Sequence, residues 1–156
     1  MSALNLDGAT IALLNYGTGK CIDLPDGSRN GKPLVGTKFQ SLQSQMWKVE
    51  LADKSTVWPA FKLQNVKFGR YADLSGGNKA SGTGIQCWEK YPNNNQLWRF
   101  VSADPQGRVI MIQNYGSGTY FDLYSGNPED GTQVKGWAGN IETKNIHQLW
   151  RVLRIN

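Results

Sequence analysis

The chain has 156 residues, enough for one domain with its own core, and its 18 glycines indicate many short connections, as in all-β proteins. The net charge of +5 would suit an anionic partner, but Lys and Arg are scattered singly along the chain, which argues against nucleic-acid binding. The two cysteines, Cys21 and Cys87, exclude a disulfide framework and a Cys-x-x-Cys metal site.

The N-terminal stretch MSALNLDGATIALLNYG has neither the basic start nor the continuous apolar core of a signal peptide. No later stretch approaches the roughly 18 apolar residues of a membrane span. With so few cysteines, a reducing compartment is the simpler expectation. We therefore expect a cytoplasmic protein that does not insert into membranes.

The first of three similar units spans about residues 11–50. Its segment NYGTGKCIDL, at 15–24, is predicted to form a strand, a tight turn and a second strand, because its glycines permit the turn. Asp23 ends this hairpin, and Gln45 and Trp47 follow as a Gln-x-Trp motif. The stretch between them, GKPLVGT, is the weakest of its kind in the chain, so this unit is the divergent one.

The second and third units, at about 61–100 and 109–153, repeat these features at intervals of 50 and 49 residues. In each unit an Asn stands eight residues before an Asp-Leu pair, and a Gln-x-Trp follows near the end. The repeated Asn, Asp and Gln are Asn15, Asp23 and Gln45; Asn65, Asp73 and Gln96; and Asn114, Asp122 and Gln148. This periodicity predicts three copies of one structural unit.

Each unit contains four short apolar or alternating runs bounded by Gly, Asn, Pro or Asp. In the second unit they are AFKLQNV, RYADL, GIQCW and LWRFV. Twelve short strands and no helix are therefore expected. Three four-stranded units that cannot each bury an apolar face alone would close around a pseudo-threefold axis. We predict a single all-β domain covering residues 1–156.

Threefold repetition with Gln-x-Trp near the end of each unit resembles the ricin B-chain-type lectins, a β-trefoil family, over residues 11–153. The resemblance implies that the Trp of each motif lies in the core and that its Gln braces the local backbone. Secreted members often carry a cysteine pair within a unit, but the expected partner position of Cys21 holds Phe39. This departure is similar to fungal members, many of which are cytoplasmic.

The second unit matches the sugar-binding pattern of that family most fully. An indole can cover the apolar face of a pyranose while a carboxylate accepts hydrogen bonds from two neighbouring hydroxyls. The resemblance implies that the Asp and Asn hold the 3- and 4-hydroxyls, that the aromatic residue stacks, and that the motif Gln orients the Asp. The residues at these positions are Asp73, Gly76, Gln86, Trp88, Asn95 and Gln96.

The third unit keeps the Asp and the Trp of this pattern but changes three other positions. Lys135 replaces the Gln, Ser125 replaces the Gly, and His147 replaces the Asn after a loop that is three residues longer. The His could donate a hydrogen bond to a hydroxyl, so we expect a second site with altered preference. Its residues are Asp122, Ser125, Lys135, Trp137, His147 and Gln148.

The first unit is expected to be weak or inactive. Asp23 remains, but Thr37 stands nearest the aromatic position and Ser44 precedes Gln45. Phe39 could substitute from two residues away.

Two structural interpretations compete with these assignments. The three aspartates could be turn residues that bond their own backbone. Trp88 and Trp137 could be buried, although Gln86 and Lys135 share their strand faces, which favours exposure.

Catalysis finds little support in the sequence. His147 is the only His, no Gly-x-Ser-x-Gly occurs, and GGNKASGTG lacks the ending of a phosphate loop. A two-carboxylate glycosidase is disfavoured because the aspartates occur once per unit and would lie far apart. We expect no enzymatic activity, no metal and no cofactor.

The expected function is therefore that of a lectin binding glycans of glycoproteins or glycolipids that end in galactose or N-acetylgalactosamine. Two sites per chain, or more in a homodimer, would give avidity and agglutination, and family analogy suggests defence. The alternatives are a β-trefoil protease inhibitor acting through loop 140–147 or 25–33, and a binder of heparin-like polyanions. Only polyanion binding should weaken steeply with salt.

Overall fold

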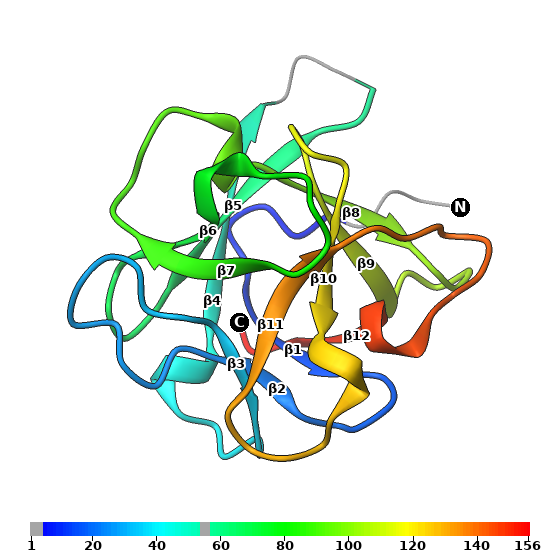
Figure 1. The fold of residues 1–156 in the computed structure, drawn as a ribbon, viewed down its shortest axis with the longest axis horizontal. Coiled ribbons are helices and arrows are strands. Elements are labelled where there is room, and N and C mark those ends of the chain that lie inside the picture. The colour runs from blue at the N-terminus through cyan, green and yellow to red at the C-terminus, as the bar shows by residue number, and fades with distance from the viewer. Residues whose placement is uncertain (1–4, 54–56) are drawn as a thin grey trace.

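The described chain, residues 5–53 and 57–156 of a computed structural model, is built from short β-strands and single 3-10 turns (Figure 1). The strands of the first repeat are β1 Thr10–Asn15, β2 Cys21–Asp23, β3 Val35–Thr37 and β4 Trp47–Asp53. Those of the second are β5 Ala60–Asn65, β6 Tyr71–Leu74, β7 Thr83–Trp88 and β8 Trp98–Ser102. Those of the third are β9 Val109–Asn114, β10 Tyr120–Leu123, β11 Thr132–Trp137 and β12 Trp150–Arg154. Across these two described ranges, no helix is long and apolar enough to cross a membrane.

Six strands close into a barrel, namely the first and last strand of each repeat. Each pairs antiparallel with its two neighbours in the ring β1, β4, β5, β8, β9, β12 and back to β1. The ring leaves no open edge among these strands, so the barrel does not offer a template for pairing with other chains. The predicted closure of three units around a shared core is thereby confirmed.

The three remaining strand pairs, β2–β3, β6–β7 and β10–β11, form hairpins that cap the barrel. Strand β11 pairs with both β3 and β7, and a bridge joins Pro33 to Gln86, so the hairpins contact one another. Figure 1 shows β3, β7 and β11 approaching each other in the middle of the view. The all-β, threefold arrangement predicted from the sequence is a β-trefoil, and the described part of the chain contains twelve strands, as expected.

The three repeated tryptophans lie in the core, where Trp47, Trp98 and Trp150 are at most 1% exposed. Each indole Nε1 donates to the backbone carbonyl of the residue that precedes the repeat's Asp. The acceptors are Ile22, Ala72 and Phe121, at 3.1, 3.0 and 3.1 Å. The repeated Trp therefore ties the last strand of each repeat to the hairpin that carries the Asp.

The three repeated asparagines clamp neighbouring repeats together. The Nδ2 atoms of Asn15, Asn65 and Asn114 donate to backbone carbonyls of the preceding repeat's Gln-x-Trp turn, at 3.1, 3.0 and 3.1 Å. The Oδ1 atoms accept from the backbone N–H three residues later, within the hairpin turn. Because these polar groups satisfy one another inside the protein, the Asn recurs in every unit.

A second set of contacts between repeats holds the ends of the cap strands. The Asn30 side chain accepts a hydrogen bond from the Glu89 backbone N–H at 2.8 Å. In the equivalent positions, Ser81 accepts from Ala138 at 2.9 Å, and Asp130 accepts from Lys38 at 3.0 Å. Each of these hydrogen bonds ties a hairpin loop to the next repeat. The bonded backbone N–H belongs to the residue directly after Thr37, Trp88 or Trp137.

Candidate functional site

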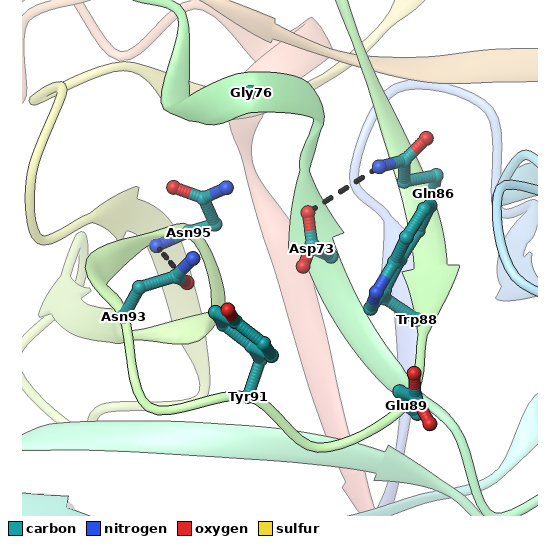
Figure 2. A pocket seen from close by; sticks show the side chains of 8 residues that line it. All are labelled: Asp73, Gly76, Gln86, Trp88, Glu89, Tyr91, Asn93 and Asn95. Atoms are coloured by element: carbon teal, nitrogen blue, oxygen red, sulfur yellow. Dashed lines mark hydrogen bonds between the residues drawn. The ribbon is translucent and has the colours of Figure 1, made fainter.

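The main candidate site is a pocket of about 440 Å³ in the second repeat. Figure 2 shows Asp73 at its centre, with Trp88 on one side and Tyr91 and Asn95 on the other. The lining residues are Asp73, Gly76, Gln86, Trp88, Glu89, Tyr91, Asn93 and Asn95. The structure therefore brings together four side chains predicted for this site, and Gly76 with them.

The Asp73 carboxylate is held from behind by two neutral amides. It is 4% exposed at the end of β6, where Gln86 lies directly opposite in the strand register. Gln86 Nε2 donates to Oδ1 at 3.4 Å, and Gln96 Nε2 donates to Oδ2 at 3.0 Å. Burial raises the pKa of Asp73, while these amide bonds and the charge of Lys62 oppose that rise. An ionised carboxylate keeps further lone pairs for donors that enter the pocket.

Gln96 does not line the pocket, but it connects Asp73 to the backbone around it. It ends the 3-10 turn η3, Asn94–Gln96, and is fully buried. Its Nε2 donates to Glu89 O at 2.8 Å as well as to Asp73, and its Oε1 accepts from the Tyr91 backbone N–H at 3.0 Å. Because both ends of the amide are bonded, the Asp73 side chain is fixed in one orientation.

Trp88 forms the apolar wall of the pocket. It ends β7 opposite Tyr71 and is half-buried, so the competing interpretation of a fully buried core residue is wrong. Its ring lies near Gly31 of the first repeat, where an added Cβ would come within 3.8 Å of it. Tyr91, across the pocket, is 54% exposed. A flat ligand face could therefore contact two aromatic side chains here.

The chain turn after β6 depends on glycine. Gly76 and Gly77 have φ of 62° and 63°, in the left-handed region that residues with a Cβ rarely adopt. A Cβ at Gly77 would also collide with the Asn95 Oδ1 atom. Glycine therefore lets the Asn95 side chain lie directly over this turn, at the edge of the pocket.

The third repeat has a smaller pocket, of about 210 Å³, lined by Asp122, Ser125, Trp137, Asn145 and His147. Gln148 Nε2 donates to Asp122 Oδ2 at 2.9 Å, and burial raises the pKa of Asp122. His147 lies over the turn after β10, as Asn95 lies over the turn after β6. A Cβ added at Gly126, the residue after Ser125, would collide with the His147 ring.

Two residues predicted for the third-repeat site, Ser125 and Lys135, differ from their counterparts Gly76 and Gln86 in the second repeat. Ser125 takes φ of 55°, a left-handed conformation that glycine adopts without strain. Lys135 is placed outside the pocket lining, because its ammonium lies over the Tyr124 ring, 5.6 Å from the centroid. Tyr124 itself packs against Trp137, with ring centroids 5.9 Å apart. This tyrosine, unassigned in the sequence, supports the indole instead.

In the first repeat, side chains of the same repeat bind the aspartate. Asp23 is 5% exposed and accepts hydrogen bonds from Thr37 Oγ1 at 2.6 Å and from Gln45 Nε2 at 3.1 Å, both on Oδ2. Thr37 pairs with Cys21 as Trp88 pairs with Tyr71, so a hydroxyl stands where the second repeat has an indole. One carboxylate oxygen is thus bonded within the repeat, while Oδ1 is buried without a hydrogen-bond partner among the described residues. No aromatic side chain stands at the position of Trp88.

Sequence reasoning assigned no role to four pocket residues: Glu89, Tyr91, Asn93 and Asn145. The two asparagines cap 3-10 turns, since Asn93 accepts from the Asn95 N–H at 3.1 Å and Asn145 from the His147 N–H at 3.0 Å. The available sequence signal was an Asn, a frequent capping residue, two positions before the pocket residues Asn95 and His147. The turn-residue interpretation of the aspartates is not supported, because the hydrogen bonds of Asp73 and Asp122 come from glutamine side chains.

Within residues 5–53 and 57–156, no three His, Cys, Asp or Glu side chains are grouped closely enough to hold a metal ion. Cys21 and Cys87 are both buried free thiols, and burial raises the pKa of each. The second-repeat pocket is lined by the carboxylates of Asp73 and Glu89, by amides and by aromatic rings.

Three comparisons relate the chain to known proteins. The sequence matches the family described as ricin-type beta-trefoil lectin domain-like in three overlapping stretches, residues 3–88, 43–137 and 94–156. A search of curated proteins gives no match.

Among solved structures, the designed threefold-symmetric protein ThreeFoil is 20% identical, with a TM-score of 0.81 and coverage of 94% of this chain and 99% of its own. The Macrolepiota procera ricin B-like lectin, solved in complex with lactose, is 21% identical, with a TM-score of 0.76 and coverage of 98% and 99%. The Rhizoctonia solani agglutinin is 23% identical, with a TM-score of 0.79 and the same coverages. At these identities the similarity establishes the fold.

Proposed function

Since the chain belongs to the ricin-type beta-trefoil lectin domain-like family, we propose that it binds glycans ending in galactose or N-acetylgalactosamine. The observation that carries this proposal is the Asp73 carboxylate, buried and braced from behind, beside the half-buried indole of Trp88. The carboxylate would accept hydrogen bonds from two adjacent sugar hydroxyls while the indole covers the apolar face. In galactose the axial 4-hydroxyl leaves that face clear. The lactose complex of the Macrolepiota procera lectin supports the same ligand class.

The protein is proposed to bind multivalently. The pocket of Asp122 and Trp137 repeats the carboxylate and the indole of the second repeat, with His147 in place of Asn95. A single shallow site is expected to bind with a dissociation constant on the order of 1 mM, about 4 kcal/mol. Two such sites would raise avidity by a factor of roughly 10² to 10⁴ where the geometry allows both to bind. The glycans of glycoproteins or glycolipids on one surface present such pairs, and defence by cross-linking them is the corresponding role.

Agglutination tests both parts of this proposal. The unmodified chain should agglutinate galactose-bearing vesicles and bind lactose in solution. Trp137→Ala should abolish agglutination by a monomeric chain yet keep lactose binding, because a molecule with one pocket cannot cross-link. The matched control is Tyr16→Ala, which removes a half-exposed aromatic side chain outside both pockets. A folded chain that binds no galactose-ending glycan at physiological salt would refute the proposal.

Galactose binding should weaken on acidification. Burial raises the pKa of Asp73 and Asp122 above the ordinary value for aspartate, so both protonate at higher pH than an exposed Asp. A protonated acid loses lone pairs and charge for the sugar hydroxyls. Lactose affinity, measured by calorimetry from pH 7.5 down to pH 3.5, should fall with a midpoint above about 3.9. A constant affinity over this range would contradict the assigned role of the carboxylates.

The raised pKa values of Asp73 and Asp122 also affect the stability of the fold, and this effect has the opposite pH dependence to that of sugar binding. Because the folded-state pKa of each Asp is raised, its contribution to the unfolding free energy is present below the unfolded-state pKa. That contribution is lost as the pH rises through the folded-state pKa. Affinity and this part of the stability therefore change in opposite directions with pH, which separates loss of binding from acid unfolding in the same titration.

A further inference from the structure

The three Gln-x-Trp glutamines share two hydrogen bonds at the amide nitrogen. Gln45, Gln96 and Gln148 each donate from Nε2 to the repeat's Asp, at 3.1, 3.0 and 2.9 Å. Each Nε2 also donates to a backbone carbonyl just after the third strand of the repeat. The acceptors are Lys38 O, Glu89 O and Ala138 O, at 2.9, 2.8 and 3.0 Å. Gln45 Nε2 also donates to Thr37 Oγ1 at 3.2 Å, but the nitrogen side does not distinguish the second repeat from the third.

The amide oxygens differ from repeat to repeat. Gln45 Oε1 accepts two backbone N–H groups, from Gln40 at 2.8 Å and Leu42 at 3.3 Å. Gln96 Oε1 accepts one backbone N–H and the ammonium of Lys62, the latter at 3.1 Å. Gln148 Oε1 is buried without a hydrogen-bond partner among the described residues. The Gln148 amide is therefore held by hydrogen bonds at its nitrogen end alone, and its buried oxygen adds no restraint.

Lys62 is specific to the second repeat. It lies three residues before Asn65 on β5, and the equivalent positions are Ala12 and Met111. Lys62 is 7% exposed, and its Nζ donates to Tyr91 O at 2.8 Å in addition to Gln96. A single ammonium thus links the glutamine behind Asp73 to the backbone of a pocket residue.

We propose that Lys62 is a positioning residue for the sugar, which holds the Gln96 amide with its nitrogen toward Asp73 and makes the second-repeat pocket the stronger one. This inference rests on the proposed function of the pocket. A reversed Gln96 amide would point its oxygen at the Asp73 carboxylate and at Glu89 O, so both bonds would become repulsive. The ammonium excludes that reversal, because it cannot accept a hydrogen bond. Gln148 has no equivalent restraint.

The pKa of Lys62 lies below its usual value, and the charge of Lys62 is coupled to that of Asp73. Burial and the neighbouring Lys90 lower the pKa of Lys62, whereas Glu50 and Asp73 raise it. Glu50 also binds Lys90 at 2.9 Å and accepts from the Tyr71 hydroxyl at 3.4 Å. In return, Lys62 lowers the pKa of Asp73 and so favours the ionised acceptor that the sugar needs. The other ionisable side chains that line the pocket are Glu89 and Tyr91.

The test replaces Lys62 with the residue of the third repeat. Lys62→Met is made in a Trp137→Ala background, where only the second pocket binds, and lactose affinity is measured by calorimetry against pH. We expect about tenfold weaker binding at pH 7.5, since a hydrogen bond to a charged group is lost. We also expect the acid midpoint of binding to move to higher pH, because the charge that lowers the Asp73 pKa is gone.

A reciprocal variant keeps the test decisive if Lys62→Met does not fold. Met111→Lys in a Trp88→Ala background should strengthen lactose binding by the third pocket, because the new ammonium can bond Gln148 Oε1. Unchanged affinity and midpoint in folded Lys62→Met would overturn the inference while the proposed function stands. Weaker binding with an unchanged midpoint would also overturn it, since a purely structural role predicts that result. No lactose binding by the unsubstituted chain would refute the proposed function and the inference together.

Discussion

Asp73→Asn is expected to weaken galactose binding by the second pocket at least tenfold while the chain stays folded. Asparagine matches aspartate in size but carries one acceptor oxygen and an NH₂ group. Two donors, Gln86 Nε2 and Gln96 Nε2, already point at the carboxylate, so the new NH₂ would face a donor or replace the oxygen that meets the sugar. Loss of charge-assisted hydrogen bonds costs about 1.5 to 3 kcal/mol, and 1.4 kcal/mol is about tenfold in affinity.

The measurement is lactose titration of Asp73→Asn in a Trp137→Ala background, with thermal unfolding to establish that the variant folds. The matched control is Asp23→Asn, because Asp23 has nearly the same burial and the same glutamine bond. Its carboxylate is closed by Thr37, so the control should lose no lactose affinity. Equal weakening in the two variants would mean that the aspartates act through the fold rather than through contact with the sugar.

The periodic residues were sufficient to predict the fold. Trp, Asn and Asp recur because each repeat needs the same three ties: indole to hairpin carbonyl, Asn to the neighbouring turn, and Asp to the motif Gln. These are local, repeated requirements, so they leave a period of about fifty residues in the sequence. The twelve strands followed from short apolar runs between turn residues.

The surroundings of the pocket were less predictable, because they depend on side-chain contacts between residues far apart in the sequence. Lys62 lies on a barrel strand 34 residues before Gln96, and only the fold brings them together. Asn30 reaches Glu89 from another repeat. Lys135 matched a pocket position by alignment, yet its long side chain extends to the Tyr124 ring. Sequence spacing places the Cα of a residue on a strand but does not fix the direction of a flexible side chain.

Trp98→Ala is expected to lower the free energy of unfolding by about 3 to 5 kcal/mol. The indole is fully buried, donates to Ala72 O at 3.0 Å and packs edge-on against Phe121, with ring centroids 4.5 Å apart. Truncation would leave a cavity between barrel and cap and an unpartnered carbonyl. Since domains of this size have about 5 to 15 kcal/mol in total, much of the chain would unfold under mild conditions. Urea unfolding followed by circular dichroism measures the change.

Trp88→Ala is the counterpart, ten residues away in the sequence and chemically identical. It is half-buried at the pocket wall, so its removal should change the unfolding free energy by only about 1 kcal/mol. Lactose binding by the second pocket should be lost, because the sugar face would have no indole to cover it. The two variants thus separate a tryptophan that holds the trefoil together from one that is presented to the ligand. A large loss of stability in Trp88→Ala, with lactose binding retained, would assign that side chain to the core and remove the aromatic platform from the proposed site.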